Sequence, residues 1–260
     1  MLPDMSRRKA RAMIEAGAVY LEGRRGRTAS KFVLAGASIA IEDEAPRAVL
    51  AEAEVRVLWE GEGIVALDKG TGIPFAPTRS AVQGTLLHAL ARALGRPIQQ
   101  LHPIHRLDTP TSGVVLVALD ASAAAFLTRA LQEERIAKTY LAWVSGAPEP
   151  PEGQWTWPLT DVRQDGRVHA DPVGRPALTR YQTLETRDGT SLLQLQPVTG
   201  RTHQLRAHCA EARCPVLGDK TYGGPLLAKR ALLHAWRISF PLPGGGEQTV
   251  EAPAPEDMGR

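Results

Sequence analysis

The sequence predicts an α+β fold in which a mixed, largely antiparallel sheet with flanking helices follows a small α/β unit. Apolar segments of strand length outnumber segments with helical spacing, and they follow one another directly instead of alternating with helices. The 260 residues, 43% of them hydrophobic and 23% charged, suffice for one large or two modest domains. This composition excludes a disordered, fibrous or disulfide-framed chain.

The small α/β unit is predicted over residues 1–45. Ser6 can cap a helix that reaches about Ala16, and short strands follow at residues 19–21 and 38–41. The first 31 residues hold eight basic and three acidic side chains, which is a local surplus of positive charge. We expect the basic side of the helix to bind an anion through Arg7, Arg8, Lys9 and Arg11.

A domain boundary is predicted where the sign of the charge reverses. Residues 42–62 hold seven acidic side chains and only two basic ones. We therefore place a linker at residues 46–54 and a larger domain over residues 55–253. The remaining residues, 254–260, form a tail. The last ten residues, 251–260, are rich in Pro and Glu and are expected to fray.

The larger domain contains short strands and three helices. The predicted strands are residues 55–59, 64–67, 114–119, 138–145, 177–184 and 192–196. Helical spacing predicts helices over residues 85–94 and 202–211, and Asp120 is placed to cap another that ends near Glu134. Trp155 and Trp157 alternate along one segment, and their rings fit either the core or an exposed stacking platform.

Composition limits the cellular setting and the cofactors. Two cysteines, Cys209 and Cys214, are too few for a secreted disulfide framework, and no leader sequence is recognised, so we expect a cytoplasmic protein. No apolar stretch approaches the roughly 20 residues that cross a bilayer. His203 and His208 lie near the cysteines, but paired C-x2-C spacings are lacking, so reduced thiols fit better than a zinc site and no metal is expected.

The segment of greatest chemical interest is residues 102–113, which precedes the apolar strand predicted at residues 114–119. Polar and ionisable groups gather there next to a buried strand, a common place for catalytic side chains. Asp108 is the ionisable residue of most interest in this segment. The alternative is a structural turn at Asp108, with Arg106 paired to a surface acid.

Four segments resemble motifs of the RluA-type RNA pseudouridine synthases. The signature loop corresponds to His105-Arg-Leu-Asp108-x-x-Thr111-Ser-Gly113, and Lys138-Thr-Tyr140 follows with its tyrosine 32 residues after the aspartate. A third motif is similar to Gly200-Arg-Thr-His203-Gln-Leu-Arg206-Ala-His208, and a leucine-bearing motif to Leu232-Leu233-His234-Ala235. The resemblance covers about residues 55–253 and implies the fold of that family, a mixed sheet with a central catalytic cleft.

The resemblance also implies a reaction and roles for individual residues. Uridine would be converted to pseudouridine without any cofactor, with Asp108, Tyr140 and Arg206 as the catalytic residues. Arg206 would act as a fixed cation that favours the ionised carboxylate. The side chains expected to bind the substrate or support its site are Arg106, Leu233, Lys138, Arg201 and His203. Among them, Arg106 would fill the gap left by the displaced base, Leu233 would wall the pocket, Arg201 would contact phosphate, and His203 would fix the loop that carries Asp108.

The N-terminal unit resembles the S-four-like RNA-binding domain, which is often joined to these synthases. The likeness lies in Ser6-Arg-Arg-Lys-Ala-Arg-Ala-Met-Ile-Glu-Ala-Gly17-Ala-Val-Tyr20 and in the strand at residues 36–41. That domain usually has another helix before the position of Ser6, so a truncated start is expected. This resemblance favours RNA as the partner, large-subunit ribosomal RNA ahead of transfer RNA, and a monomeric enzyme.

Two other classes of function stay open at this stage. A protein with the same fold could bind RNA or assist ribosome assembly without catalysis. A metal-dependent nuclease would use the His and Asp residues instead, and chelators would inhibit it.

Overall fold

The computed structural model describes residues 54–77, 84–161 and 166–259, together with residues 14, 19–21, 24–25, 33 and 36–41 near the N-terminus. The last group includes a small antiparallel sheet in the order β2-β1-β3, made of β1 (Val19–Leu21), β2 (Arg24–Arg25) and β3 (Ile39–Ile41). Two of these strands match the predicted ones. The basic residues of the predicted helix, Arg7, Arg8, Lys9 and Arg11, and the linker at residues 46–53 lie outside the described residues.

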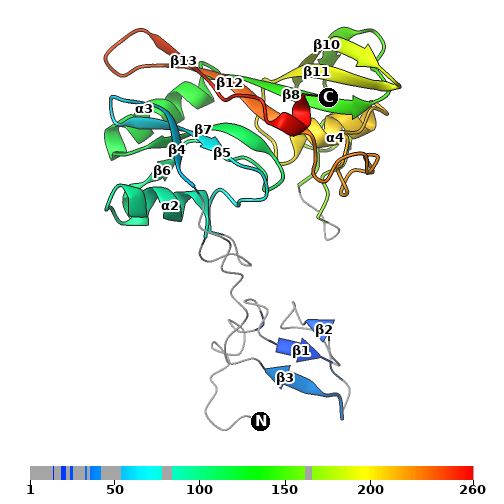
Figure 1. The fold of residues 1–260 in the computed structure, drawn as a ribbon, viewed down its shortest axis with the longest axis horizontal. Helices are drawn as coiled ribbons and strands as arrows, with labels where there is room; N and C mark the ends of the chain where they lie inside the picture. The colour runs from blue at the N-terminus through cyan, green and yellow to red at the C-terminus, as the bar shows by residue number, and fades with distance from the viewer. Residues whose placement is uncertain are drawn as a thin grey trace.

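A ten-stranded sheet forms the main body (Figure 1). Eight strands follow the order β4-β5-β7-β12-β8-β11-β10-β9, while β13 pairs with β12 and β6 with β7. Their bounds are β4 (Arg56–Gly61), β5 (Ile64–Lys69), β6 (His102–Pro103), β7 (Ser112–Ala118), β8 (Ala137–Ser145), β9 (Glu152–Trp155), β10 (Thr179–Arg187), β11 (Thr190–Pro197), β12 (Leu233–Pro241) and β13 (Glu247–Glu251). The β7–β12 pair is parallel and the other pairs of this sheet are antiparallel, so the predicted mixed, largely antiparallel sheet is confirmed.

Three α-helices flank the sheet, as Figure 1 shows: α2 (Leu86–Ala93), α3 (Ala121–Gln132) and α4 (Gln204–Glu211). The side chains of Thr85 and Asp120 cap α2 and α3 by accepting from the backbone N–H of the third helical residue. Helix α4 lies against β10 and β11, and α3 lies against β7 and β12. None of the helices in the described part of the chain is long and apolar enough to span a membrane.

The centre of the sheet is a close crossing of β7 and β12. Every residue of β7 is buried, and Gly113 pairs with Ala235 of β12. Gly113 has φ of 113°, and a Cβ atom there would collide with the backbone of Ala235. Only glycine fits, so the signature loop is held at the junction of the two halves of the sheet.

The C-terminal residues are packed, so the expectation that they fray is wrong. A short 3₁₀ helix, Glu256–Met258, buries Met258, and Trp143 Nε1 donates to Met258 O at 2.8 Å. Arg230 donates from Nη2 and Nε to the two carboxylate oxygens of Asp257 at 2.6 and 2.7 Å. The tail stays ordered because these contacts tie it to β8 and to the segment before β12. Strands β2, β6, β9, β12 and β13 were also missing from the sequence prediction.

Candidate active site

The loop that holds Asp108 is fixed to the sheet by backbone hydrogen bonds. It covers residues 104–111 and leads directly into β7. The N–H of Ile104 donates to Leu116 O at 3.2 Å, and the N–H of Thr111 donates to Asp108 O at 3.0 Å, closing a turn. Asp108 is therefore presented by a short, anchored loop at the end of a buried strand.

His105 fixes the same loop through its ring. Its Nε2 atom accepts a hydrogen bond from Leu116 N at 3.2 Å, so the proton of the neutral ring lies on Nδ1. Burial, with the nearby charge of Lys138, lowers the pKa of His105 to about 3. The ring is thus a neutral structural support at physiological pH.

Lys69, at the end of β5, is a fully buried lysine below this loop. Its Nζ atom donates to the carbonyl oxygens of Gly70, Ile73 and Thr109 at 2.9, 2.8 and 3.2 Å. Burial lowers the pKa of Lys69 to about 7, against the opposing attraction of Asp108. One buried amine thereby joins the loop after β5 to the loop that carries Asp108.

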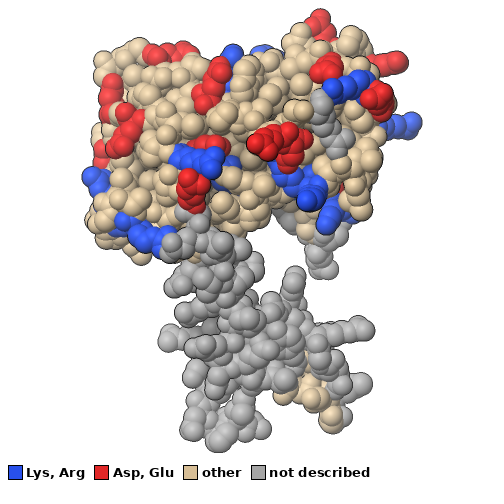
Figure 2. All heavy atoms as spheres, viewed as in Figure 1, with Lys and Arg blue, Asp and Glu red and all other residues tan. Residues whose placement is uncertain are grey.

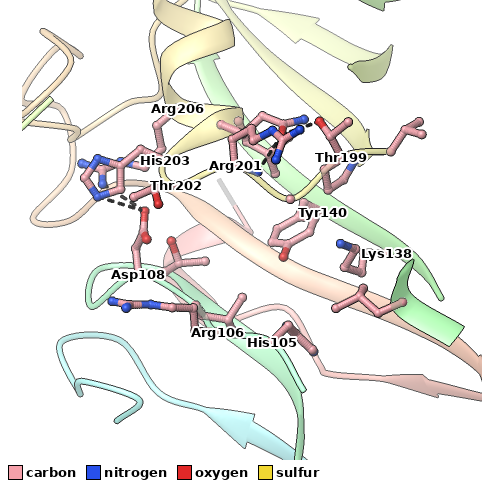
Figure 3. Close-up of a pocket in the computed structure, with 18 of the residues that line it drawn as sticks. His105, Arg106, Asp108, Lys138, Tyr140, Thr199, Arg201, Thr202, His203 and Arg206 are labelled. Atoms are coloured by element: carbon pink, nitrogen blue, oxygen red, sulfur yellow. Dashed lines mark hydrogen bonds and ion pairs between the residues drawn. The ribbon is translucent and has the colours of Figure 1, made fainter. Parts of the chain in front are cut away.

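Arg206 on α4 reaches Asp108 across the site (Figure 3). Its Nη1 donates to Asp108 Oδ2 at 3.1 Å. On its other edge, Nε and Nη2 donate to the two oxygens of Asp219 at 2.6 and 2.8 Å. The side chains of Arg206 and Asp219 are 5% and 1% exposed, whereas that of Asp108 is 21% exposed. Asp219 therefore fixes the position of the guanidinium, which donates one N–H group to Asp108, the carboxylate that faces the cavity.

The charge of Arg206 is permanent in this setting. Burial by itself would lower the pKa of Arg206, but the hydrogen bonds and charge of Asp219, with those of Asp108, raise it above its usual value. Its guanidinium also lies over the ring of Tyr222, with Cζ 5.0 Å from the ring centroid.

Helix α4 begins at an organised turn that sets the position of Arg206. The side chain of Gln204 accepts from Thr199 Oγ1 at 2.7 Å and from Arg201 N at 3.0 Å, and it donates to Leu178 O at 2.9 Å. Gln204 is buried, so these bonds fix the turn before the helix to β10 and β11.

His203 lies beside Asp108 at the start of α4. Its Nε2 atom is 3.7 Å from Asp108 Oδ2, and its Nδ1 atom is 3.1 Å from the hydroxyl of Tyr222. The same hydroxyl accepts from Val168 N at 2.9 Å, which leaves its own proton for His203. Burial lowers the pKa of His203, so the neutral ring can turn an Nε2–H group toward the carboxylate.

Tyr140 and Leu233 come from neighbouring strands and share one face of the sheet. Tyr140 of β8 pairs with Ala235 of β12, and Leu233 of β12 pairs with Ala142 of β8. Both side chains are buried and line the cavity. Burial, with the negative charge of Asp108 adding to it, raises the pKa of Tyr140 well above its usual value, so the phenol keeps its proton.

The other expected site residues surround the same cavity (Figure 3). Arg106 is exposed on the signature loop, and Lys138 is half-buried on β8 with its pKa lowered by burial. Arg201 donates from Nε to Pro176 O at 3.0 Å. All eight residues predicted for catalysis and substrate binding thus line one cavity: Arg106, Asp108, Lys138, Tyr140, Arg201, His203, Arg206 and Leu233.

The cavity has a volume of about 520 Å³, within the range of roughly 300–1,000 Å³ typical of small-molecule sites. It lies between the signature loop, the start of β8, the turn before α4 and the first residue of β12. On the face shown in Figure 2, basic and acidic side chains are interspersed. Arg106, Lys138 and Arg201 line the cavity and are cations of the kind that contacts phosphate.

The groups considered for a metal are used in other ways. His208 lies near the hydroxyl of Thr179 through Nδ1, at 2.9 Å, and near Trp157 O through Nε2, at 3.0 Å. Cys209 and Cys214 are free and buried, and burial raises the pKa of both thiols. Among the described residues, no group of three or more His, Cys, Asp or Glu side chains is placed to hold a metal ion.

The two tryptophans have different environments. Trp155 is buried and stacks on Tyr181 with ring centroids 4.3 Å apart, so it belongs to the core. Trp157 is 36% exposed and stacks on Trp155 at 6.3 Å. The core interpretation therefore holds for Trp155.

Three residues of the site were missed by sequence reasoning. Asp219, Tyr222 and Lys69 support Arg206, His203 and the signature loop respectively. Asp219 lies in a loop whose sequence has no helical or strand periodicity. Its pairing with Arg206 depends on the assembled fold. A signal existed for Lys69, which ends an apolar strand directly before the glycine-rich loop of residues 70–77.

The fold and the site fit an enzyme that isomerises a nucleoside within RNA, and the comparisons with known proteins agree. Residues 63–211 match the family described as RNA pseudouridylate synthase. An uncharacterized RNA pseudouridine synthase of Chloroflexus aurantiacus is 37% identical over 99% of this chain and 84% of its own length. The dual-specificity RNA pseudouridine synthase RluA of Escherichia coli K12 is 35% identical over 76% of this chain and 92% of its own length.

Solved structures show the same relationship. The human RNA pseudouridylate synthase domain containing 4 is 25% identical, with a TM-score of 0.64 over 78% of this chain and 90% of that one. The human RNA pseudouridylate synthase domain containing 1 is 26% identical, with a TM-score of 0.66 over 81% of this chain and 86% of that one. The chain belongs to the RluA-like family of RNA pseudouridine synthases, which are isomerases.

Proposed function

We propose that the enzyme converts uridines of structured RNA to pseudouridine through a covalent bond to Asp108. The bond between C1′ of the ribose and N1 of uracil breaks, and a bond between C1′ and C5 forms. The ring loses a proton from C5 and gains one at N1, so the reaction needs no cofactor and no co-substrate. The carboxylate of Asp108 bonds transiently to the base ring or to the sugar carbon.

The contact between Arg206 and Asp108 carries this proposal. A carboxylate under a bound base loses its hydration, which favours the neutral acid. The Nη1–H group at 3.1 Å, on a guanidinium that Asp219 holds in place, opposes that effect and keeps the anion available. The neighbouring Nε2 atom of His203, 3.7 Å away, adds a second polar contact without a competing charge.

Tyr140 and Leu233 would hold the base between them. The ring of Tyr140 offers a face for the pyrimidine, and Leu233 keeps water from the intermediate. Because the phenol of Tyr140 stays protonated, we propose that its oxygen accepts the C5 proton while its own proton passes to water at the mouth of the cavity, and that N1 takes its proton from water. Lys138 would support this step electrostatically.

Access to the target base requires turning the nucleotide out of its stack, which costs a few kcal/mol. We propose that Arg106, exposed at the cavity, fills the vacated position and stacks on the neighbouring bases. Arg201 would contact phosphate. Such phosphate contacts supply affinity that falls with salt, while the shape of the RNA selects the site.

We further propose large-subunit ribosomal RNA as the substrate, with transfer RNA as the alternative. The support is the N-terminal unit, residues 1–45, which we assign as an S-four-like RNA-binding domain joined by residues 46–54 to the catalytic domain. About a quarter of this chain has no counterpart in the E. coli enzyme named dual-specificity, whereas the Chloroflexus relative aligns with 99% of this chain. The specificity of the E. coli enzyme therefore need not apply to this chain.

We also propose that the enzyme works as a monomer in the cytoplasm. One chain supplies every residue of the candidate site, which supports the monomer. The two buried, unpaired cysteines, Cys209 and Cys214, are in keeping with a reducing compartment.

The covalent role is tested with Asp108→Asn and total RNA that carries tritium at C5 of uridine, prepared from cells that lack the gene. We expect the release of tritium to fall by more than about 10³-fold while RNA affinity stays within threefold, because phosphate contacts dominate affinity. Asp161→Asn is the matched control, since the side chain of Asp161 is 82% exposed and away from the cavity. Retained turnover in Asp108→Asn would refute the assignment.

The substrate is tested separately by mapping pseudouridine in total RNA from cells with and without the gene. A pseudouridine that is lost from large-subunit ribosomal RNA when the gene is absent supports the proposed target. A position missing only from transfer RNA replaces it with the alternative.

A further inference from the structure

The hydroxyl of Thr111 is buried and has no hydrogen-bond partner within the described part of the chain. The residue is 2% exposed and lines the cavity that holds Asp108. Its neighbour Ser112 differs, because the Ser112 hydroxyl lies 3.0 Å from Nδ1 of His234 in a satisfied contact. A buried hydroxyl without a partner costs about 1–3 kcal/mol, so the position of Thr111 calls for a partner from outside the protein.

The position of Thr111 is set by its surroundings. Its N–H bonds to Asp108 O, and the following residues enter β7, where Gly113 is pressed against β12. A β-branched side chain has restricted rotation about χ1. The hydroxyl is therefore a fixed group at the cavity, on the residue that closes the turn begun by Asp108 three residues earlier.

The reaction itself supplies a fitting partner. Uracil leaves through N1 and returns through C5, and a half-turn of the ring about the line through N3 and C6 exchanges these two atoms. The same half-turn exchanges the carbonyl oxygens O2 and O4. A single fixed donor that meets one carbonyl oxygen before the turn therefore meets the other after it.

We infer that Thr111 is a substrate-contacting residue whose hydroxyl donates to a carbonyl oxygen of the uracil ring, O2 and O4 in turn. A neutral donor beside Tyr140 and Leu233 matches a neutral carbonyl, whereas phosphate would be drawn to the arginines at the rim. This inference rests on the isomerase activity of the family and does not depend on which atom Asp108 attacks. It explains how the detached base is held at the same place before and after the half-turn.

The test compares Thr111→Val, which keeps the shape and removes the hydroxyl, with Thr111→Ser, which keeps the hydroxyl. Thr183→Val is the matched control, because Thr183 Oγ1 is likewise buried without a partner among the described residues but does not line the cavity. Single-turnover release of tritium, RNA affinity and the melting temperature are measured for each variant on total RNA from cells lacking the gene.

We expect Thr111→Val to lose about 10–100-fold in the single-turnover rate, the effect of one hydrogen bond to the substrate. RNA affinity should stay within twofold and the melting temperature should equal or exceed that of the wild type, because no protein hydrogen bond is lost. Thr111→Ser and Thr183→Val should stay within threefold of the wild-type rate. A reduced affinity for RNA would point to failure of the binding surface instead of this contact.

Besides a reduced affinity for RNA, two results would overturn the inference. One is a Thr111→Val enzyme whose rate is within twofold of the wild type. The other is a melting temperature that falls by several degrees, which would assign the hydroxyl to the protein structure. Should Thr111→Val fail to fold, the ratio of rates between Thr111→Ser and Thr111→Ala isolates the hydroxyl, and a ratio near one contradicts the inference.

Discussion

Asp108 and Asp219 bind two different edges of the same guanidinium, that of Arg206. Asp219 is 1% exposed and binds through both oxygens, whereas Asp108 is 21% exposed and accepts a single hydrogen bond. The first carboxylate thus serves as a fixed support and the second remains open to the cavity. The following predictions separate the two roles.

Replacing Asp219 should damage both stability and rate. Asp219→Asn removes the charge that neutralises a buried guanidinium, and we expect the free energy of unfolding to fall by about 2–4 kcal/mol. The rate of tritium release should fall at least tenfold, since Arg206 is no longer held toward Asp108. Denaturant unfolding and the tritium assay check this, with Asp161→Asn as an exposed control that changes stability by less than about 0.5 kcal/mol. A fully stable Asp219→Asn enzyme would contradict the supporting role.

Lys69 should make stability depend on pH. Its pKa is about 7 in the folded enzyme and about 10.4 when unfolded, so between these values the unfolded state binds more protons. Stability therefore rises with pH across this window, by up to about 1.4 kcal/mol per pH unit, and the gain is lost as pH falls toward 7. Urea unfolding from pH 7 to 10 should show this slope in the wild type.

The variant that tests this is Lys69→Met, in which the rise of stability with pH that is due to Lys69 should be absent. Lys220→Met, at an exposed lysine, should keep it. Equal slopes in the wild type and Lys69→Met would show that Lys69 keeps its ordinary affinity for protons.

Tyr140→Phe should separate the contribution of the Tyr140 ring to RNA binding from the contribution of its hydroxyl to the reaction rate. The phenylalanine still packs against the base, so RNA affinity should change less than twofold. The release of the C5 proton should slow by about 10²-fold or more, in the range of a lost acid–base group. Because the pKa of Tyr140 is raised, the wild-type rate should also show no loss from phenol ionisation up to pH 9. Stopped reactions with tritiated RNA measure both effects, and an unchanged rate in Tyr140→Phe would remove the hydroxyl from the reaction.

Shortening the chain after Pro255 should destabilise the catalytic domain. The truncation removes buried Met258 together with Asp257. It leaves the indole N–H of Trp143 without its acceptor and the guanidinium of Arg230 without its carboxylate partner. We expect a loss of about 3–5 kcal/mol in the free energy of unfolding. Removal of Arg260 alone is the control. Thermal unfolding of the two truncated enzymes decides whether the tail is structural.

The sequence predicted those parts of the structure that local patterns determine. Asp120 caps a helix as predicted, and the helix predicted over residues 85–94 is present as α2. Strands β5, β7, β8 and β11 lie within one or two residues of the predicted strands. The contact of Asp108 with Arg206 was implied by family resemblance and is present at 3.1 Å.

The parts that were missed depend on the assembled fold. Strand β12 lies in the middle of the sheet, yet it includes half-buried Trp236 and Arg237, so its sequence lacks the apolar run expected of a central strand. The buried Lys69 runs against the usual exposure of lysine and is satisfied only by carbonyl groups of two loops. The tail looked disordered by composition because its binding groups, Trp143 and Arg230, are far away in the sequence.

The position of β12 also sets the order in which a newly made chain can mature. This strand lies between β7 and β8, but it is synthesised after all other strands of the sheet except β13. While the ribosome is still making the preceding segments, β7 and β8 have no neighbour on the sides that later face β12, and Leu233 is absent from the cavity. The nascent enzyme therefore completes its catalytic cavity only when almost the whole polypeptide has emerged.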